Sequence, residues 1–373
     1  MVLGRHSYYF AYWTRIGWAG VDLFFVLSGF LVSGLLFISY RKHARIDLSR
    51  FYIRRGLKIW PAFYALVVAG LLIDAAIPGH VVSTKGLLPE LLFMQSYFHG
   101  ICGITWSLAV EEHFYLTLPL LLLLLGRNKE KPFALFPCVF AAVAILALSC
   151  RFAQGWSENG TLNYMTFLSP THLRIDGLMF GALLSYYRYF RPEIFKRIAC
   201  WRGGWVLIAS AGLLLSFVKL ENRHMHTWGY TVIYLAAGCL VAKAVQFEGP
   251  RLIRAVSTLL ARIGVYSYSI YLWHIFFLHR VLGHLHIASR ALSFWCYLGG
   301  AILFGIAAAK LIEIPALRFR DRIFPNSGLR NAAPQIRTME PNAMPALAEQ
   351  SIFQKMKFSP PRTARGDCTT SNG

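Results

Sequence analysis

Residues 105–119 read TWSLAVEEHFYLTLP and lead directly into six consecutive leucines at 120–125. Apart from two adjacent glutamates and a histidine, the segment is apolar and has the length of a membrane-spanning helix, about 20 residues. The whole chain has only 17 acidic residues in 373. Two carboxylates inside one apolar segment therefore indicate a polar site within a membrane protein.

The composition supports this interpretation. The chain is 56% hydrophobic and only 15% charged, whereas soluble domains average about 25% charged residues. Its apolar residues form continuous runs of roughly 17–23 residues, which favours helices over the alternating strands of a β-barrel. We predict an all-α polytopic transmembrane helical bundle of about ten spans, the first one truncated. The predicted spans are 1–13, 17–39, 59–77, 105–125, 133–153, 169–187, 204–220, 229–247, 263–282 and 292–312.

The net charge of +21 is spread unevenly among the loops between the predicted spans. Basic residues concentrate in loops 40–58, 126–132, 188–203 and 248–262 and in the C-terminal tail, whereas loop 78–104 has only Lys85 and 154–168 has none. By the positive-inside rule, the basic loops and the C-terminus face the cytoplasm. The charge therefore indicates orientation in a membrane rather than a nucleic-acid partner.

The chain divides into a membrane-embedded domain at 1–325 and a tail at 326–373 that is rich in Pro, Ser, Asn and Thr. We expect the tail to be a disordered cytoplasmic segment. The seven cysteines are scattered and none has metal-ligand spacing, so no metal site is predicted.

Several ionisable residues fall in or near the predicted spans. Each costs about 2.5–3.5 kcal/mol at the centre of a bilayer and usually faces the bundle interior or a water-filled cavity. Any one of them can be explained as a structural hydrogen bond between helices, but the set predicts a polar interior open to at least one face. The set is His6, Asp22, Glu111, Glu112, His113, His172, Arg174, Asp176 and His274.

Helical geometry separates the two glutamates. Residues four apart share a helix face, so Glu111 falls in line with Ser107 and Tyr115, which are polar. Glu112 falls in line with two leucines instead. We expect Glu111 to be the working carboxylate and Glu112 to lie near a neighbouring helix or at the outer boundary of the bundle.

Three further stretches carry polar residues in apolar surroundings: residues 20–31 with Asp22 and Ser28, 171–187 with His172, Arg174 and Asp176, and 266–274 with Ser267, Tyr271 and His274 on one face. Arg174 could pair with Glu111, bind an oxyanion or form a structural ion pair. Gly177 and Gly181 have the spacing of a small-residue pair that lets another helix approach closely.

The chain resembles the acyltransferase 3 family of bacterial integral-membrane O-acyltransferases. The matching strings occur in the family's order and cover roughly residues 3–325. They are GVDLFFVLSGFL at 20–31, FYIRRGLKIWP at 51–61, TWSLAVEEHFYLTLP at 105–119, HLRIDGLMFGALL at 172–184, GVYSYSIYLWH at 264–274 and IEIPALRFRDR at 312–322.

The resemblance implies transfer of an acyl group, usually acetyl, from cytoplasmic acyl-CoA to a hydroxyl of an extracytoplasmic glycan or glycolipid, such as lipopolysaccharide O-antigen or exopolysaccharide. The family's catalytic histidine falls on His6, and the arginine that precedes it in the family would lie upstream of Met1. We therefore expect the true start to lie upstream. The tail is too short for the esterase-like domain of some members, so the protein either acts directly on a glycan or passes its acyl group to a separate extracytoplasmic transferase.

The family's Trp-Ser-Leu motif contains Trp106 and selects Glu111, in agreement with the helical-face argument. The family's Arg-x-x-Arg appears here as Arg55-Gly-Leu-Lys58, and lysine lacks the planar fork of arginine. Basic residues beside a membrane suit either anionic lipid headgroups or the phosphates of CoA. We place acyl-CoA, the donor substrate, at Arg54, Arg55 and Lys58; no permanently bound cofactor is expected.

The predicted mechanism uses His6 as a general base or a transient acyl carrier. Glu111 orients the imidazole or deprotonates the acceptor, and Arg174 stabilises the oxyanion. Asp22, Ser28, Trp106, Tyr115, His172, Asp176, Tyr271 and His274 are supporting residues. Two other interpretations stay open: a proton-coupled glycolipid carrier, although no internal symmetry is visible, and an inactive truncated relative.

Overall fold

The computed structural model describes residues 2–6, 11–76, 85–157, 164–247, 250–284, 287 and 289–324. Within these residues the protein is entirely helical and contains no strand, which confirms the predicted all-α class. The predicted tail at 326–373 lies outside the described residues.

The chain begins with two short helices, α1 (Val2–Arg5) and α2 (Ala11–Ile16), which lead through a 3-10 turn into the long helix α3. The helices that follow α2 are α3 (Gly20–His43), α4 (Leu48–Ala76), α5 (Leu87–Leu91), α6 (Trp106–Leu125), α7 (Phe136–Ser157), α8 (Tyr164–Phe167), α9 (Thr171–Phe190), α10 (Pro192–Cys200), α11 (Gly203–Phe217), α12 (Tyr230–Gln246), α13 (Arg251–Gly264), α14 (Ser267–Arg280), α15 (Arg290–Ala308) and α16 (Ile314–Ile323).

Six helical segments of the described chain are long and apolar enough to cross a membrane. They are Tyr12–His43, Leu48–Ala76, Trp106–Leu125, Phe136–Gly155, Met225–Gln246 and Ala291–Ile323. A seventh is possible if α10 and α11, which meet at a bend of 59°, form one span. Six of the ten predicted spans thus correspond to such segments, and ten spans are not confirmed: α14 has only 14 residues, and α9 carries Arg174, Asp176 and Arg188.

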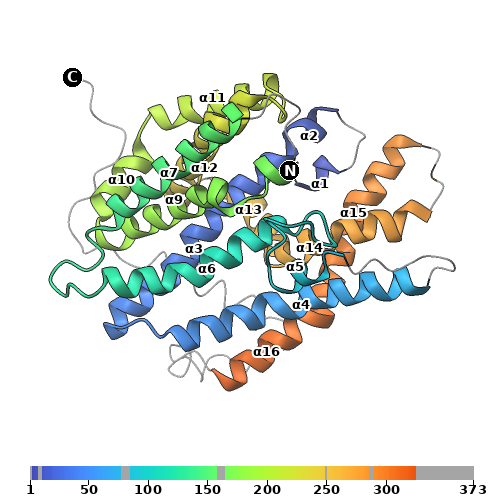
Figure 1. Cartoon of the computed structure of the whole chain (residues 1–373), viewed down its shortest axis with the longest axis horizontal. Helices are drawn as coiled ribbons and strands as arrows, with labels where there is room; N and C mark the ends of the chain where they lie inside the picture. Colours follow the sequence, from blue (N-terminus) through green and yellow to red (C-terminus); the bar gives the residue numbers. More distant parts are fainter. Residues whose placement is uncertain are drawn as a thin grey trace.

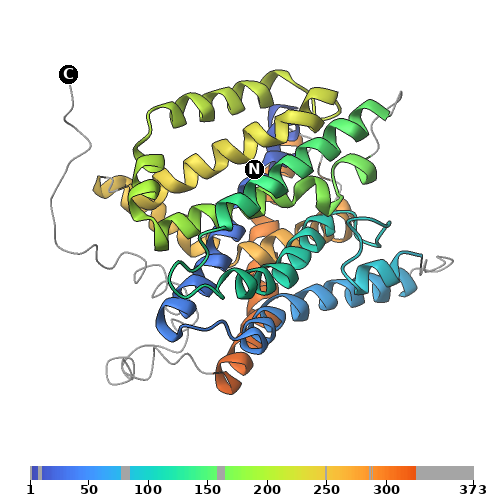
Figure 2. The ribbon, with the colours of Figure 1, turned by 60° about the vertical axis from the view of Figure 1, so that its left-hand side comes forward.

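Most of the long helices run along the same direction, lengthwise through the molecule (Figures 1 and 2). α6 lies beside α4, and α3 passes through the middle of the bundle (Figure 1). The ends where α3 turns into α4, α6 into α7 and α9 into α10 all lie at the left-hand end in Figure 1. Three of the basic loops identified in the sequence are therefore at one end of the bundle, as the positive-inside argument requires.

The closest helix contact is between α3 and α9, and it depends on two glycines. A Cβ atom on Gly29 would lie 2.0 Å from the carbonyl oxygen of Leu178, and one on Gly181 would lie 2.1 Å from that of Val26. The sequence correctly singled out Gly181. Its predicted partner Gly177 makes only ordinary contacts, with a Cβ no closer than 3.5 Å to Tyr234, so the close approach is made by Gly29 and Gly181 together.

This contact gives a stability prediction. Gly29→Ala places a methyl group against backbone that cannot rotate away, so we expect a loss of ~1–3 kcal/mol in folding free energy, seen as a lower melting temperature and a lower yield of folded protein. Gly212→Ala in α11 is the matched control, because its Cβ meets no atom within 4 Å. Equal melting temperatures for the two variants would show that α3 and α9 are not held at this distance.

Candidate active site

One face of α6 carries a row of buried polar side chains, Ser107, Glu111 and Tyr115, which are at most 3% exposed. The Tyr115 hydroxyl donates to Glu111 Oε2 at 2.5 Å, and Ser28 on α3 donates to the same oxygen at 3.4 Å. Ser28 and Tyr115 also share a hydrogen bond. The helical-face prediction for Glu111 is therefore confirmed as geometry: its carboxylate faces the interior polar row.

At one end of this row lies Arg55 of α4. Its Nη2 donates to the Tyr115 hydroxyl at 2.5 Å, and its guanidinium lies 4.1 Å from the centre of the Tyr115 ring. A cation over an aromatic face is stabilised by the ring quadrupole, more so when it is shielded from water. Arg55 thus points into the bundle interior.

The other two residues of the predicted CoA cluster bind acidic residues near the C-terminal end of the described chain. Arg54 forms an ion pair with Asp321 at 3.2 Å and donates to the Phe324 carbonyl, whereas Lys58 pairs with Glu313 at 3.4 Å. The sequence analysis missed both acids as partners, although both belong to the string IEIPALRFRDR at 312–322 that it quoted. The three cations share one end of α4 but have separate partners.

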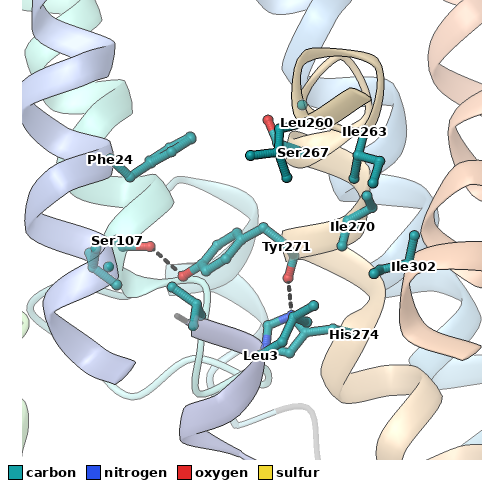
Figure 3. Close-up of a pocket in the computed structure, with 14 residues that line it drawn as sticks. Leu3, Phe24, Ser107, Leu260, Ile263, Ser267, Ile270, Tyr271, His274 and Ile302 are labelled. Atoms are coloured by element: carbon teal, nitrogen blue, oxygen red, sulfur yellow. Dashed lines mark hydrogen bonds between the residues drawn. The ribbon is translucent and has the colours of Figure 1, made fainter. Parts of the chain in front are cut away.

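The other end of the α6 row reaches Tyr271 and His274 of α14 (Figure 3), and His274 forms a pair of histidines with His6. Ser107 shares a 2.6 Å hydrogen bond with the Tyr271 hydroxyl, which also donates to the Ile104 carbonyl at 2.9 Å. His274 follows Tyr271 by less than one turn of α14, and its ring centre lies 5.3 Å from that of His6. The structure therefore brings His6 next to His274, whereas in the sequence His6 lies far from the 266–274 motif that contains both Tyr271 and His274.

The hydrogen bond of His274 fixes its tautomer. Its Nδ1 bonds to the Tyr271 carbonyl, and a carbonyl can only accept, so Nδ1 carries the proton. Nε2 then presents a lone pair. This nitrogen is buried and has no hydrogen-bond partner among the described residues, so it is an unsatisfied acceptor.

A cavity of about 320 Å³ adjoins the histidine pair. It is lined by Val2, Leu3, Gly20, Val21, Phe24, Ser107, Leu260, Ile263, Gly264, Ser267, Ile270, Tyr271, His274 and Ile302. Ser267, Tyr271 and His274 all lie in this lining, as their shared helix face predicted. The cavity is largely apolar, with its polar groups gathered toward α6 and α14 (Figure 3).

The loop before α6 is organised by Glu90, which the sequence analysis did not single out. The carboxylate is fully buried and accepts hydrogen bonds from the Thr105 hydroxyl at 2.5 Å and the Cys102 amide at 3.3 Å. Burial raises the pKa of Glu90. By holding Thr105, which precedes the first residue of α6, Glu90 fixes where α6 begins and where the Ile104 carbonyl lies.

Glu112 and the two nearby histidines lie away from the row. Glu112 accepts a hydrogen bond from the Trp60 indole of α4 at 3.3 Å, a contact with a neighbouring helix as expected. His113 bonds to Thr171 at 2.7 Å, and the exposed His172 stacks on Tyr97. The sequence treated His172 and Asp176 as one constellation, but they have separate partners, because Asp176 is buried and pairs with Arg151.

Two buried ion pairs hold α9 in the bundle. Arg174 pairs with Asp22 of α3 at 2.8 Å and lies 3.8 Å from the centre of the Tyr230 ring, with Trp106 also nearby. Arg151 of α7 pairs with Asp176 at 2.7 Å. Of the partners considered for Arg174, the structure shows the structural ion pair and not Glu111. Arg151 was missed, although a lone arginine in the apolar run 133–153 was the available signal.

The Arg174–Asp22 pair can be tested by a double-mutant cycle. Arg174→Met leaves a buried, unpaired carboxylate, which typically costs ~3–5 kcal/mol, so we expect a large drop in melting temperature. Asp22→Asn combined with Arg174→Met removes both charges and should recover part of that loss. If the two single effects simply add in the double variant, the residues are not coupled. A folded but inactive double variant would support the predicted oxyanion role of Arg174.

Known proteins resemble this chain over most of its length. A family model described as an acyltransferase domain matches residues 2–310. A putative O-acetyltransferase of Staphylococcus aureus strain MRSA252 is 26% identical over 84% of this chain and 56% of its own length. Peptidoglycan O-acetyltransferase OatA of Listeria monocytogenes is 25% identical over 70% of this chain and 45% of its own.

A third relative, O-acetyltransferase OatA of S. aureus strain NCTC 8325, is 26% identical over 71% of this chain and 46% of its own length. The chain thus spans about half the length of the curated relatives it matches. No solved structure matches. Because the family model covers most of the chain, as the six ordered motifs predicted, this protein belongs to the acyltransferase 3 family.

Proposed function

We propose that the protein is a membrane O-acyltransferase that moves an acyl group, such as acetyl, from cytoplasmic acyl-CoA to a hydroxyl of an extracytoplasmic saccharide. The names of the relatives, which include O-acetyltransferases and a peptidoglycan O-acetyltransferase, support this reaction class. The acceptors considered from the sequence were lipopolysaccharide O-antigen and exopolysaccharide; peptidoglycan joins them through the Listeria relative.

The observation that carries the proposal is the polar row of α6. From Ser107 to Tyr115 it extends about 12 Å along the helix. It reaches Arg55 at one end and, at the other, Tyr271 and the cavity, whose lining includes His274 with His6 beside it. A reaction that takes a donor from one side of a membrane and an acceptor from the other needs such a connection. Buried polar groups in a span are costly, so a complete row of them favours a functional role.

The histidine pair supplies the acid–base chemistry. In the proposed step, His274 Nε2 takes the proton of the acceptor hydroxyl while the hydroxyl oxygen attacks the thioester carbonyl carbon. A C–O bond forms, the C–S bond breaks, and the proton then passes to the CoA thiolate, so the step is balanced. His6, beside His274, either relays this proton or holds the acyl group on its imidazole in an intermediate stage.

Glu111 supports this chemistry from the centre of the row. Its contacts are to Tyr115 and Ser28, and Tyr115 in turn holds Arg55. We therefore assign to Glu111 the positioning of Arg55 and of the hydroxyls around it, in place of the direct contact with His6 that the sequence analysis considered.

The donor is placed at the basic end of α4. Arg54 and Lys58 are each about one-fifth exposed, and their partners Asp321 and Glu313 neutralise them in the described structure. In the proposal, the phosphates of acyl-CoA compete for these cations. This orientation puts the basic loops and the C-terminus in the cytoplasm and the protein in a bacterial inner membrane. It leaves the acceptor, or a separate extracytoplasmic transferase, on the opposite side.

The test compares the two adjacent glutamates in membranes containing the full chain. Labelled acetyl-CoA should label a lipid-linked or cell-surface saccharide. Glu111→Gln keeps the size of the side chain but removes its charge, and loss of a positioned group of this kind typically lowers kcat ~10²–10⁴-fold. Glu112→Gln, whose partner is Trp60, should stay within about tenfold of the wild type when activity is expressed per folded molecule.

Two outcomes would contradict the proposal. The assignment of Glu111 fails if Glu112→Gln abolishes turnover at normal abundance while Glu111→Gln stays active. The enzyme proposal itself fails if no saccharide is labelled and the protein instead moves a glycolipid across vesicles in response to a proton gradient.

A further inference from the structure

The cavity beside the histidines is much larger than an acetyl group requires. Its volume of about 320 Å³ is roughly ten times the ~30 Å³ that one water molecule occupies in the liquid. An acetyl group contributes only two carbons and one oxygen. If acetyl were the only acyl group that reaches His274, most of this space would stay unfilled.

The side chains that line the cavity determine which chemical groups can bind in it. Apolar side chains from five helices form most of the wall, among them Leu3, Phe24, Ile270 and Ile302 (Figure 3). The hydroxyls of Ser107 and Tyr271 are bonded to each other. His274 Nε2 is the unpaired, fully buried polar atom of this wall.

Two parts of the proposed substrates fit such a wall poorly. The pantetheine arm of CoA carries two amides, and a saccharide carries several hydroxyls. Burying these groups without hydrogen-bond partners is unfavourable. A hydrocarbon chain needs no such partners, and each CH₂ group that leaves water contributes about fourfold to affinity.

One part of the cavity wall is the end of α13, where Leu260 is 61% exposed. Gly264, the last residue of this helix, lines the cavity, and a Cβ atom on it would meet no atom within 4 Å. Leu260 and Ile263 lie beside it in the lining. A larger side chain at position 264 can therefore be accommodated without displacing neighbouring residues, and the variant protein should still fold.

We propose that this cavity is a binding site for the hydrocarbon chain of the donor's acyl group, so that the protein prefers acyl groups several carbons longer than acetyl and Gly264 sets their length. The inference rests on the proposed function for its transfer step. The carbonyl end of the acyl group lies toward His274 Nε2, and the chain extends between Phe24, Ile270 and Ile302 toward Gly264.

The first experiment measures transfer from acetyl-, butanoyl-, hexanoyl- and octanoyl-CoA in membranes containing the full chain. We expect kcat/KM for hexanoyl-CoA to exceed that for acetyl-CoA by at least about tenfold, from the methylene contribution above. Gly264→Leu should lower this hexanoyl-to-acetyl ratio by at least about tenfold. Gly212→Leu on α11, also in open space, should leave the ratio unchanged. A preference for acetyl, or a ratio that Gly264→Leu does not alter, would overturn the inference.

The second experiment is independent of transfer. Purified protein is irradiated with hexanoyl-CoA that carries a diazirine on the terminal carbon, and the labelled peptides are identified by mass spectrometry. Labelling of peptides containing Phe24, Ile270 or Ile302, reduced by Gly264→Leu, supports the site. If such labelling occurs without any acyl transfer, the proposed function fails while the binding site stands. Labelling elsewhere excludes the site even if acetyl transfer is observed.

Discussion

The Tyr115 hydroxyl is the point on which the interior of this protein depends. It lies between a guanidinium on α4, a carboxylate on its own helix and a serine on α3, and it bonds to all three. Removing a charge from water costs several kcal/mol even after the protein relaxes. Arg55 and Glu111 can both be buried in the bundle because the Tyr115 hydroxyl stabilises both charges. It accepts a hydrogen bond from the guanidinium and donates one to the carboxylate. Without that hydroxyl, Arg55 and Glu111 would lose the partner that they share, and Glu111 would keep only the longer hydrogen bond from Ser28 among the contacts described above.

The surrounding fold keeps these three helices in register. α3 brings Ser28 to Glu111, and the next residue, Gly29, allows the close packing of α3 on α9. The same pair of helices is joined by Arg174 and Asp22, deeper in the contact. Glu90 sets the start of α6, and Ile104, just before that start, receives the hydroxyl of Tyr271. The histidine pair and the arginine end are therefore positioned by the same helix, α6, from its two ends.

Much of this arrangement was predictable from the helical periodicity of the sequence and from the free-energy cost of placing charged groups in a membrane. Helical spacing was enough to place Ser107, Glu111 and Tyr115 in one row, because residues four apart must share a face. It was enough to group Ser267, Tyr271 and His274 for the same reason. Long apolar runs predicted the helical class and six of the spans, while α9 and α14 failed the test of length and composition because one is rich in charges and the other is short.

What the sequence could not provide was the pairing between distant segments. Nothing local links Arg151 to Asp176, Arg54 to Asp321 or His6 to His274, since these pairs are created by packing rather than by spacing. His172 and Asp176 illustrate the opposite error: correct helical spacing, but one side chain exposed and stacked on Tyr97 while the other is buried against Arg151. Spacing identifies a shared face, and only the neighbouring helices decide what each residue on it contacts.

The most direct test of the account is the turnover per folded molecule of Tyr115→Phe, which deletes a single oxygen and keeps the ring beneath Arg55. Tyr52→Phe is the matched control, because Tyr52 also joins α4 to α6, through the Leu116 carbonyl at 2.8 Å, but lies outside the row. The account predicts that Tyr115→Phe loses acyl transfer by ~10²-fold or more while Tyr52→Phe keeps it. Full activity of Tyr115→Phe at normal abundance would contradict it, because the row would then not connect the two ends of the site.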